Sequence, residues 1–577
     1  MICDAFRQTA LQLLGELPSL QGLDLDLLLV TPPRPEQGDY ALPTFALAKP
    51  LRRAPAAIAS EVAEQARQRL AAYPAIAGVE AVGPFVNLTI DPTVRARQTL
   101  ATIAAQGERY GCSDAGQGRV VAIDFSSPNI AKPFGIGHLR STVIGSALCN
   151  LYRSQGYQPH GVNHVGDWGK QFGMLMVALS ERADGLGELE RAEDPISFLL
   201  ELYVGVNQRA AQEPQVEQRA RDWFVALERG DAAARTMWQR CVSVSMQEFE
   251  RIYDLLGVRA NLTHVWGESH YEGEPLQRVI RELEQRGLLV ESEDARVVFL
   301  DGDLPPCLIL KKDGATLYAT RDLAAAIYRQ ETLAAWRLVY VVGAPQALHF
   351  RQVFQVLDKL GYAWADNCLH VPFGHIRLPE GAMSTRKGNI ILLDEVLRRA
   401  IALVDGIVSV RDYPAEEREA IARAVGIGAV IFADLSGSRQ RDWEFRWEDL
   451  LNFSGRTGPY LQYTQARLGS VLRKYGQEVP TSFDPARLAD PEAQAVLRQL
   501  GLFPAVVAAA LEAHEPSVVS RYLLDLAEAQ NSFYNAQRIL DAEQPETSAA
   551  RIALIAAVRT VLVNGLKLLG IPVPPRM

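Results

Sequence analysis

Hydrophobic residues along this chain follow patterns typical of strands in some segments and of helices in others. The clearest change from one pattern to the other lies between residues 120 and 156. Val120–Ile123 is an apolar, largely β-branched run, which is typical of a strand buried on both faces of a parallel sheet. Apolar residues then recur every four positions, which predicts one buried face of a helix: Leu139, Val143, Ala147 and Leu151. Gly156 predicts the end of this helix. A glycine-rich turn, residues 125–138, therefore joins a central strand to a helix N-terminus.

Similar patterns divide the rest of the chain into parts. Near the N-terminus, Pro55 opens a helical pattern, and residues 86–90 alternate as a strand with one buried face. These features predict a small α+β domain, followed by a linker that carries four glycines between residues 107 and 118. The sequence between about 180 and 290 has the composition of helices, and the pattern of a buried strand returns at residues 338–343.

The turn after the first strand has the properties of a phosphate site. Free N–H groups and the helix dipole favour an anion at a helix N-terminus, and Lys132 and His138 add side-chain donors. A dinucleotide fingerprint would need a glycine where Arg140 stands, and the phosphate-loop ending Gly-Lys-Ser/Thr is absent. The alternative is a tight turn whose glycines serve packing only.

Composition and charge narrow the class of protein. The chain has 577 residues, which suggests several domains, and 48% of them are hydrophobic, as in ordinary globular proteins. Its six cysteines form no CxxC pair, so neither a zinc site nor a disulfide framework is expected. We find no signal peptide and no uncharged apolar run of membrane-spanning length, and predict a cytoplasmic protein. The net charge of −9 argues against indiscriminate nucleic-acid binding.

The turn also carries a family resemblance. Residues 125–142 read FSSPNIAKPFGIGHLRST, and Gly135–His138 within them resembles the HIGH signature of class I aminoacyl-tRNA synthetases. The flanks SSPNIAK and HLRST point to the arginyl enzymes of that class. The resemblance implies that Gly135, Gly137 and His138 bind ATP and that His138 is catalytic. Gly135 stands where the family has its first signature histidine.

A second motif, residues 382–389 (AMSTRKGN), resembles the KMSKS loop of the same class. The resemblance implies that Met383 and Ser384 bind ATP and that Arg386 and Lys387 supply catalytic charge. Both KMSKS lysines are missing, because Ala382 and Thr385 occupy their positions. By the same resemblance Lys132, just before the first signature, compensates for them as a catalytic residue. In isolation this stretch would be read as a solvated basic turn.

Residues 317–324 (LYATRDLA) resemble the arginine-binding motif of the family. Tyr318 and Asp322 would contact the guanidinium, which suits planar acceptors. Asp124 would face the substrate side chain, and Asn129 and Gln346 would bind its α-amino group. The alternative for Asp322 is an ordinary acidic residue at a helix N-terminus.

The ends of the chain continue the likeness. Residues 458–467 (GPYLQYTQAR) resemble the start of the helical anticodon-binding domain of arginyl-tRNA synthetases. Tyr460 and Tyr534 are candidates to stack on tRNA bases, because exposed aromatic rings bind unpaired bases. Residues 38–41 and 83–87 resemble the N-terminal domain, which in that family touches the tRNA elbow.

Together these features predict a Rossmann-like α/β catalytic domain in residues 119–455 with a connective insertion at about 180–290. An N-terminal tRNA-contacting domain is expected in residues 1–112 and an all-α anticodon-binding domain in residues 456–577. The implied reaction is ATP-dependent activation of L-arginine and its transfer to the 3′ adenosine of tRNA, by a monomer using ATP with Mg²⁺ and no protein-bound metal. Two alternatives remain: a binding-only paralogue, which Gly135 motivates, and a nucleotidylyltransferase that shares the fold.

Overall fold

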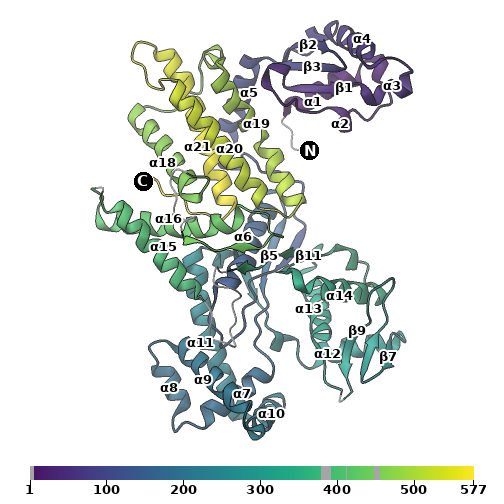
Figure 1. Ribbon diagram of the computed structural model, residues 1–577, viewed down its shortest axis with the longest axis vertical. Coiled ribbons are helices and arrows are strands. Elements are labelled where there is room, and N and C mark those ends of the chain that lie inside the picture. Colours follow the sequence, from purple (N-terminus) through teal and green to yellow (C-terminus); the bar gives the residue numbers. More distant parts are fainter. Residues whose placement is uncertain (1–4, 313, 378–390, 411, 448–454) are drawn as a thin grey trace.

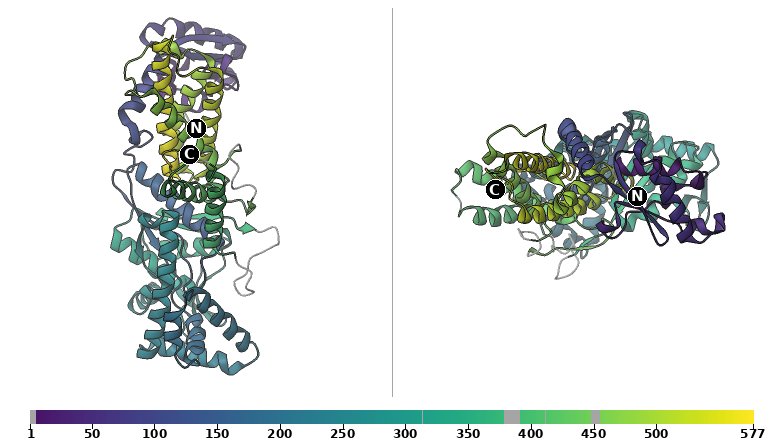
Figure 2. Two further views of the ribbon diagram at one scale, coloured as in Figure 1. Left: turned by 90° about the vertical axis from the view of Figure 1, so that its left-hand side faces the viewer. Right: turned by 90° about the horizontal axis from the view of Figure 1, so that it is seen from above.

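The computed structural model describes residues 5–312, 314–377, 391–410, 412–447 and 455–577. The molecule is elongated (Figures 1 and 2). A five-stranded sheet lies near its middle, the N-terminal domain and a bundle of C-terminal helices lie side by side at one end, and two lobes inserted between strands lie at the other. This arrangement confirms the fold class expected from the sequence, with a parallel-sheet domain, a small N-terminal domain and an all-helical C-terminal domain.

The N-terminal domain packs helices on a three-stranded antiparallel sheet. Its strands β1 (Tyr40–Pro43), β3 (Phe85–Ile90) and β2 (Ile76–Val82) are paired in that order. Helix α4 (Pro55–Arg67) covers the sheet with the apolar face that its spacing predicts, and Ile58, Val62 and Ala66 are buried. Helices α1 (Ala5–Gly15), α2 (Leu25–Leu28) and α3 (Phe45–Leu51) complete this domain.

The central sheet has the strand order β11-β10-β4-β5-β6, and all of its neighbours pair in parallel. The strands are β4 (Val120–Asp124), β5 (Gln158–Asn163), β6 (Leu262–Val265), β10 (Arg337–Gly343) and β11 (Cys368–Phe373). The chain runs from β4 outward through β5 to β6, and then returns to the other side of β4 with β10 and β11. The order therefore reverses between β4 and β10, and the carboxyl edge at such a point is where open α/β sheets bind ligands.

Helix α6 (Leu139–Ser154) packs its apolar face against this sheet, as the four-residue spacing predicts. The helix ends just before Gly156, whose φ of +78° favours glycine. A Cβ atom at Gly145 would lie 2.2 Å from the ring of Phe125, so this glycine allows the helix to approach the turn after β4 closely.

The two lobes are inserted on either side of β6. The first lobe contains α7 (Lys170–Ser180), α8 (Gly185–Arg191), α9 (Pro195–Ala210), α10 (Pro214–Glu228) and α11 (Ala232–Leu256). The second contains α12 (Glu274–Gln285), the antiparallel strands β7 (Leu289–Ser292), β8 (Ala295–Val298) and β9 (Cys307–Lys311), and α13 (Tyr318–Leu333). The expected helical stretch at 180–290 is thus interrupted by β6, an edge strand too short at four residues to stand out in the pattern.

After β10 come α14 (Ala347–Lys359), α15 (Leu393–Val408) and α16 (Ala415–Leu435), with β12 (Ile376–Arg377) and β13 (Trp443–Glu444) paired beside them. The C-terminal bundle consists of α18 (Gly458–Tyr475), α19 (Pro491–Glu512), α20 (Ser517–Ala536) and α21 (Pro545–Leu568). By length and composition α19 and α21 could cross a membrane, but half or more of each apolar window is buried inside the protein. Helix α5 (Pro92–Gln106) packs against both of these helices.

Candidate active site

The turn between β4 and α6 is held in an unusual backbone conformation. Ser126, Ser127 and Ala131 all have positive φ angles, between 49° and 71°, which non-glycine residues rarely adopt. The segment after β5 stabilises this shape, because the N–H of Ile130 donates to the carbonyl of Gly166 at 3.1 Å. Backbone strain of this kind, at the carboxyl edge of a parallel sheet, is typical of a binding site.

The first signature lies at the end of this turn. A short 3₁₀ turn, η5 (Ile136–His138), leads into α6, so the positive end of the helix dipole lies at the signature. The N–H groups of Ile136, His138 and Leu139 already donate to the carbonyls of Ile391, Gly135 and Ile136. Burial lowers the pKa of His138 to about 4, and the charge of Lys132 contributes to the shift. The imidazole is therefore neutral near pH 7. Its Nδ1 atom is buried and has no hydrogen-bond partner in the part of the chain that the structure describes.

Lys132, Gly135, Gly137 and His138 lie in the short segment between β4 and α6, and the charge of Lys132 is felt at His138. Lys132 is half-buried, and its Nζ atom lies 5.8 Å from the ring centre of Tyr203 in α9. The residues predicted from the second motif, Met383, Ser384, Arg386 and Lys387, lie outside the described residues.

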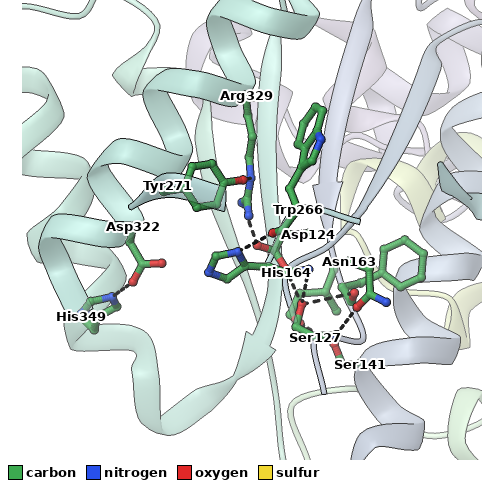
Figure 3. Close-up of polar contacts among 12 residues, drawn as sticks. Asp124, Ser127, Ser141, Asn163, His164, Trp266, Tyr271, Asp322, Arg329 and His349 are labelled. Atoms are coloured by element: carbon green, nitrogen blue, oxygen red, sulfur yellow. Dashed lines mark hydrogen bonds and ion pairs between the residues drawn. The ribbon is translucent and has the colours of Figure 1, made fainter. Parts of the chain in front are cut away.

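The predicted arginine-binding residues lie at the same edge of the sheet. Tyr318 and Asp322 occupy the first turns of α13; the Tyr318 side of this turn is open, since that residue is 71% exposed. His349 Nε2 of α14 lies 2.5 Å from the carboxylate of Asp322 (Figure 3). Gln346 is exposed in the short turn η8 (Ala344–Gln346), directly after β10. Asn129 faces Gly166, where a Cβ atom would lie 2.4 Å from the Asn129 amide oxygen.

Asp124 is the last residue of β4 and is buried. Its Oδ2 accepts a hydrogen bond from Arg329 Nη1 at 2.7 Å, and its Oδ1 accepts one from Ser127 Oγ at 2.9 Å (Figure 3). The sequence reasoning missed Arg329, Ser127 and His349. A signal for Arg329 does exist, because it follows Asp322 by two helical turns and so lies on the same face of α13.

More carboxylates lie near Asp322. Burial raises the pKa of Glu268 to about 7; Arg321 opposes the shift, while Asp167, Asp322 and Glu272 add to it. Burial also raises the pKa of Asp167, although that carboxylate accepts hydrogen bonds from Ser269 N at 2.8 Å and Ser269 Oγ at 2.5 Å. Acidic groups this close together favour a cationic ligand.

The two tyrosines predicted to bind tRNA lie apart from this edge, in the C-terminal bundle. Tyr460 of α18 is half-buried, and its hydroxyl accepts a hydrogen bond from Asn531 Nδ2 at 2.7 Å. Tyr534 of α20 is also half-buried, and the guanidinium of Arg467 lies 4.0 Å from its ring centre. Among the described residues, no group of three or more His, Cys, Asp or Glu side chains is arranged to hold a metal ion.

A parallel sheet with a phosphate-type turn at its reversal point, joined to a helical C-terminal domain, defines a class I aminoacyl-tRNA synthetase. Three family models match: "tRNA synthetases class I (R), catalytic domain" over residues 99–447, "DALR anticodon binding domain" over 461–577, and "Arginyl tRNA synthetase N terminal domain" over 4–90. The chain therefore belongs to the arginyl-tRNA synthetase family.

Individual relatives agree with this assignment. The chain is 45% identical to an arginine–tRNA ligase of Clostridioides difficile and 42% identical to one of Clostridium beijerinckii, with 96% of each chain covered in both cases. Among solved structures, it resembles the arginyl-tRNA synthetase of Thermus thermophilus with a TM-score of 0.81 and 27% identity, over the whole of both chains. The arginyl-tRNA synthetase of Plasmodium falciparum, at 20% identity and a TM-score of 0.79, shares the fold.

Proposed function

We propose that this arginine–tRNA ligase works in two steps at the carboxyl edge of its central sheet. The carboxylate of L-arginine attacks the α-phosphate of ATP to form arginyl-adenylate and pyrophosphate, and the 3′ adenosine of tRNA then attacks the adenylate. One observation carries this proposal beyond family membership. The strand that ends in the carboxylate of Asp124 continues directly into the phosphate-type turn, so a site for a cation and a site for an anion adjoin.

The turn supplies the phosphate side of the reaction. ATP enters as its Mg²⁺ complex, and the positive end of the α6 dipole favours its phosphates at this turn. A neutral His138 donates one N–H without bringing a charge of its own, and Lys132 supplies the positive charge. No covalent protein intermediate is required, because positioning and charge stabilisation carry phosphoryl transfer. Met383, Ser384, Arg386 and Lys387 complete this site in the proposal.

The pocket beside the turn selects arginine. A guanidinium presents five N–H donors in a plane, and Asp322, Asp124 and the hydroxyl of Tyr318 are acceptors suited to it. Asn129 and Gln346 are assigned to the α-amino group. The additional carboxylates around Glu268 favour a cationic over a neutral amino acid.

The two ends of the chain bind tRNA in this proposal. The helical domain, residues 456–577, reads the anticodon with Tyr460 and Tyr534 as stacking platforms, and the N-terminal domain, residues 1–112, touches the tRNA elbow. The catalytic domain spans residues 119–455. We assign the protein to the cytoplasm as a monomer without a membrane partner.

Gly135 supports a second candidate function, a paralogue that binds arginine or tRNA but catalyses poorly. With glycine in place of a histidine, the turn has one fewer hydrogen-bond donor to the phosphate. Such donors stabilise the charge of the transition state and account for much of the rate of catalysis.

Charging assays separate the two functions. The ligase should charge arginine-accepting tRNA and leave lysine and glutamine tRNAs uncharged, and its arginine-dependent pyrophosphate exchange should require tRNA. Charging of another amino acid would contradict the arginine pocket, whereas binding of tRNA and arginine without charging would support the paralogue.

A further inference from the structure

We propose that Arg329 is a positioning residue for arginine recognition, which acts by holding the carboxylate of Asp124 toward the substrate. The inference rests on the proposed arginine pocket and extends it to a residue that need not touch the substrate. It assigns a role in arginine recognition to a later turn of α13, beyond the turns that carry Tyr318 and Asp322.

Arg329 is buried and contacts Asp124, Tyr271 and Tyr340. Its side chain is 2% exposed and that of Asp124 8% exposed, and Nη1 and Oδ2 lie 2.7 Å apart. Arg329 Nε donates to the hydroxyl of Tyr271 at 3.3 Å. The guanidinium also lies 5.9 Å from the ring centre of Tyr271 and 5.7 Å from that of Tyr340. These contacts hold the guanidinium from several sides and leave it one anionic partner, Asp124, among the described residues.

Asp124 in turn depends on its donors for its orientation. A carboxylate has about four lone-pair sites, and Arg329 and Ser127 use one on each oxygen of Asp124. Each oxygen keeps a site for a further donor, so the carboxylate can still receive the paired N–H groups of a guanidinium. Without Arg329 the carboxylate would keep, among the described residues, only the bond from Ser127 and could rotate away from the substrate.

The charge of Arg329 matters as much as its shape. Burial opposes the positive charge of Arg329, but the neighbouring Tyr271, Asp124 and Tyr340 outweigh this effect and keep the pKa of Arg329 above its usual range, so the group stays charged. Asp124 is the anion among these three neighbours. A buried charge is tolerated only with a partner. Arg329 Nη2 has no hydrogen-bond partner among the described residues, which makes the pair with Asp124 the main compensation for this charge. Replacing either residue would therefore leave the charge of the other buried without its partner.

A double-mutant cycle tests this inference in the full-length enzyme. The four proteins are the wild type, Arg329→Met, Asp124→Asn and the double variant, and the measured quantities are kcat, KM for arginine and KM for ATP in tRNA charging. We expect Arg329→Met to raise the KM for arginine about tenfold while the KM for ATP hardly changes. In the Asp124→Asn background the same substitution should add nothing, because Arg329 acts through Asp124. Arg329→Lys should restore part of the arginine affinity.

Two control variants distinguish a loss of stability from a loss of arginine binding, and a wrong arginine pocket from a wrong role for Arg329. Arg95→Met breaks another buried ion pair, Arg95–Asp39, at side-chain exposures of 3% and 7%, and should lower the melting temperature without changing the KM for arginine. Asp322→Asn tests the arginine pocket itself. If Asp322→Asn leaves the KM for arginine unchanged, the proposed pocket is wrong.

If Asp322→Asn raises that KM but Arg329→Met does not, only the role of Arg329 is wrong. Equal factors for Arg329→Met in both backgrounds would also overturn it, since they would indicate a general structural effect. Should Arg329→Met fail to fold, Arg329→Lys in the wild-type and Asp124→Asn backgrounds gives the same comparison. The double variant with Arg329→Met and Asp124→Asn lacks both charges of the pair, so it leaves neither one uncompensated.

Discussion

Gly135 and Leu392 form an antiparallel bridge, which joins the first signature to the chain that follows residue 390. The N–H of Ile136 donates to the carbonyl of Ile391, and the N–H of Leu393 donates to the carbonyl of Phe134, both at 2.9 Å. Residues 391–393 come directly after the range that contains the second motif. Paired backbone therefore connects the first motif to residues 391–393 at Gly135, the position where the family signature has a histidine.

Replacing Asp322 by asparagine should weaken arginine binding selectively. The substitution preserves shape and removes the charge of the carboxylate that lies 2.5 Å from His349 Nε2. A charge-assisted hydrogen bond contributes roughly 1.5–3 kcal/mol, so the KM for arginine should rise about ten- to a hundredfold. The KM for ATP should stay close to that of the wild type. Asp301→Asn, an exposed acid of the same lobe paired with Lys359, is the matched control and should change neither constant.

The affinity for arginine should depend on pH through Glu268. Its pKa of about 7 means that it is mostly ionised at pH 8 and mostly protonated at pH 6. Protonation removes a negative charge near Asp322, so the KM for arginine should rise roughly two- to fivefold as the pH falls from 8 to 6. Glu268→Gln should abolish this part of the pH dependence, while the exposed Glu274→Gln should preserve it. A Glu268→Gln profile as steep as that of the wild type would contradict the assignment.

The ionised carboxylate of Asp39 should stabilise the folded protein at neutral pH, and this stabilisation should be lost at acid pH. Burial alone would raise the pKa of this carboxyl, but Arg95, Arg498 and the N–H of Ile90 outweigh it and hold the pKa below its usual value. A lowered folded-state pKa gives stability that is present above the unfolded-state pKa and is lost as the pH falls through the folded-state value. Asp39→Asn should cost about 3–5 kcal/mol at neutral pH, because it leaves Arg95 buried without its anion.

Thermal unfolding over a pH series measures this effect. The gap in melting temperature between the wild type and Asp39→Asn should narrow toward acid pH. Asp294→Asn, whose carboxylate is 80% exposed in a pair with Lys312, should change stability by less than about 1 kcal/mol. A constant gap between pH 7 and the acid limit would show that the charge of Asp39 is not what stabilises the fold.

Local patterns were sufficient to predict the elements that carry the site. The apolar run at Val120–Ile123 became β4, the four-residue spacing after Leu139 became α6, and Gly156 follows the helix end with a positive φ. These features depend on residues a few positions apart, which is the range over which periodicity and turn chemistry are informative. The resemblance in residues 125–142 then indicated the family.

Contacts between distant residues could not be predicted in this way. Arg329 is 205 positions from Asp124, and only the fold brings the two together. Helix α5 lies next to the N-terminal domain in sequence, yet Arg95 Nη1 donates to Gln494 of α19 at 2.9 Å and the helix packs on the C-terminal bundle. No local signal distinguishes this packing from packing on the preceding strands, because an amphipathic helix does not specify its partner.

Lys132 should compensate for the signature histidine that Gly135 replaces. Gly135 has φ −80° and ψ 164°, an extended conformation that any residue can adopt, so the backbone itself does not exclude a histidine. Lys132 is three residues upstream, and its charge reaches His138 closely enough to lower the pKa of that imidazole. If Lys132 replaces the lost donor, Lys132→Ala should reduce kcat by about 10²–10³ and change the KM for ATP much less, because the interaction strengthens in the transition state.

Gly135→His should then restore part of the rate of Lys132→Ala, since an imidazole at that position returns a donor to the developing charge on the phosphate. The four proteins of this cycle should be compared by single-turnover formation of arginyl-adenylate in the presence of tRNA, which isolates chemistry from product release. An unchanged kcat in Lys132→Ala would assign the compensating charge to another cation, with Lys387 the next to test. A loss of rate that Gly135→His cannot relieve would show that Lys132 acts from a position the imidazole does not reach.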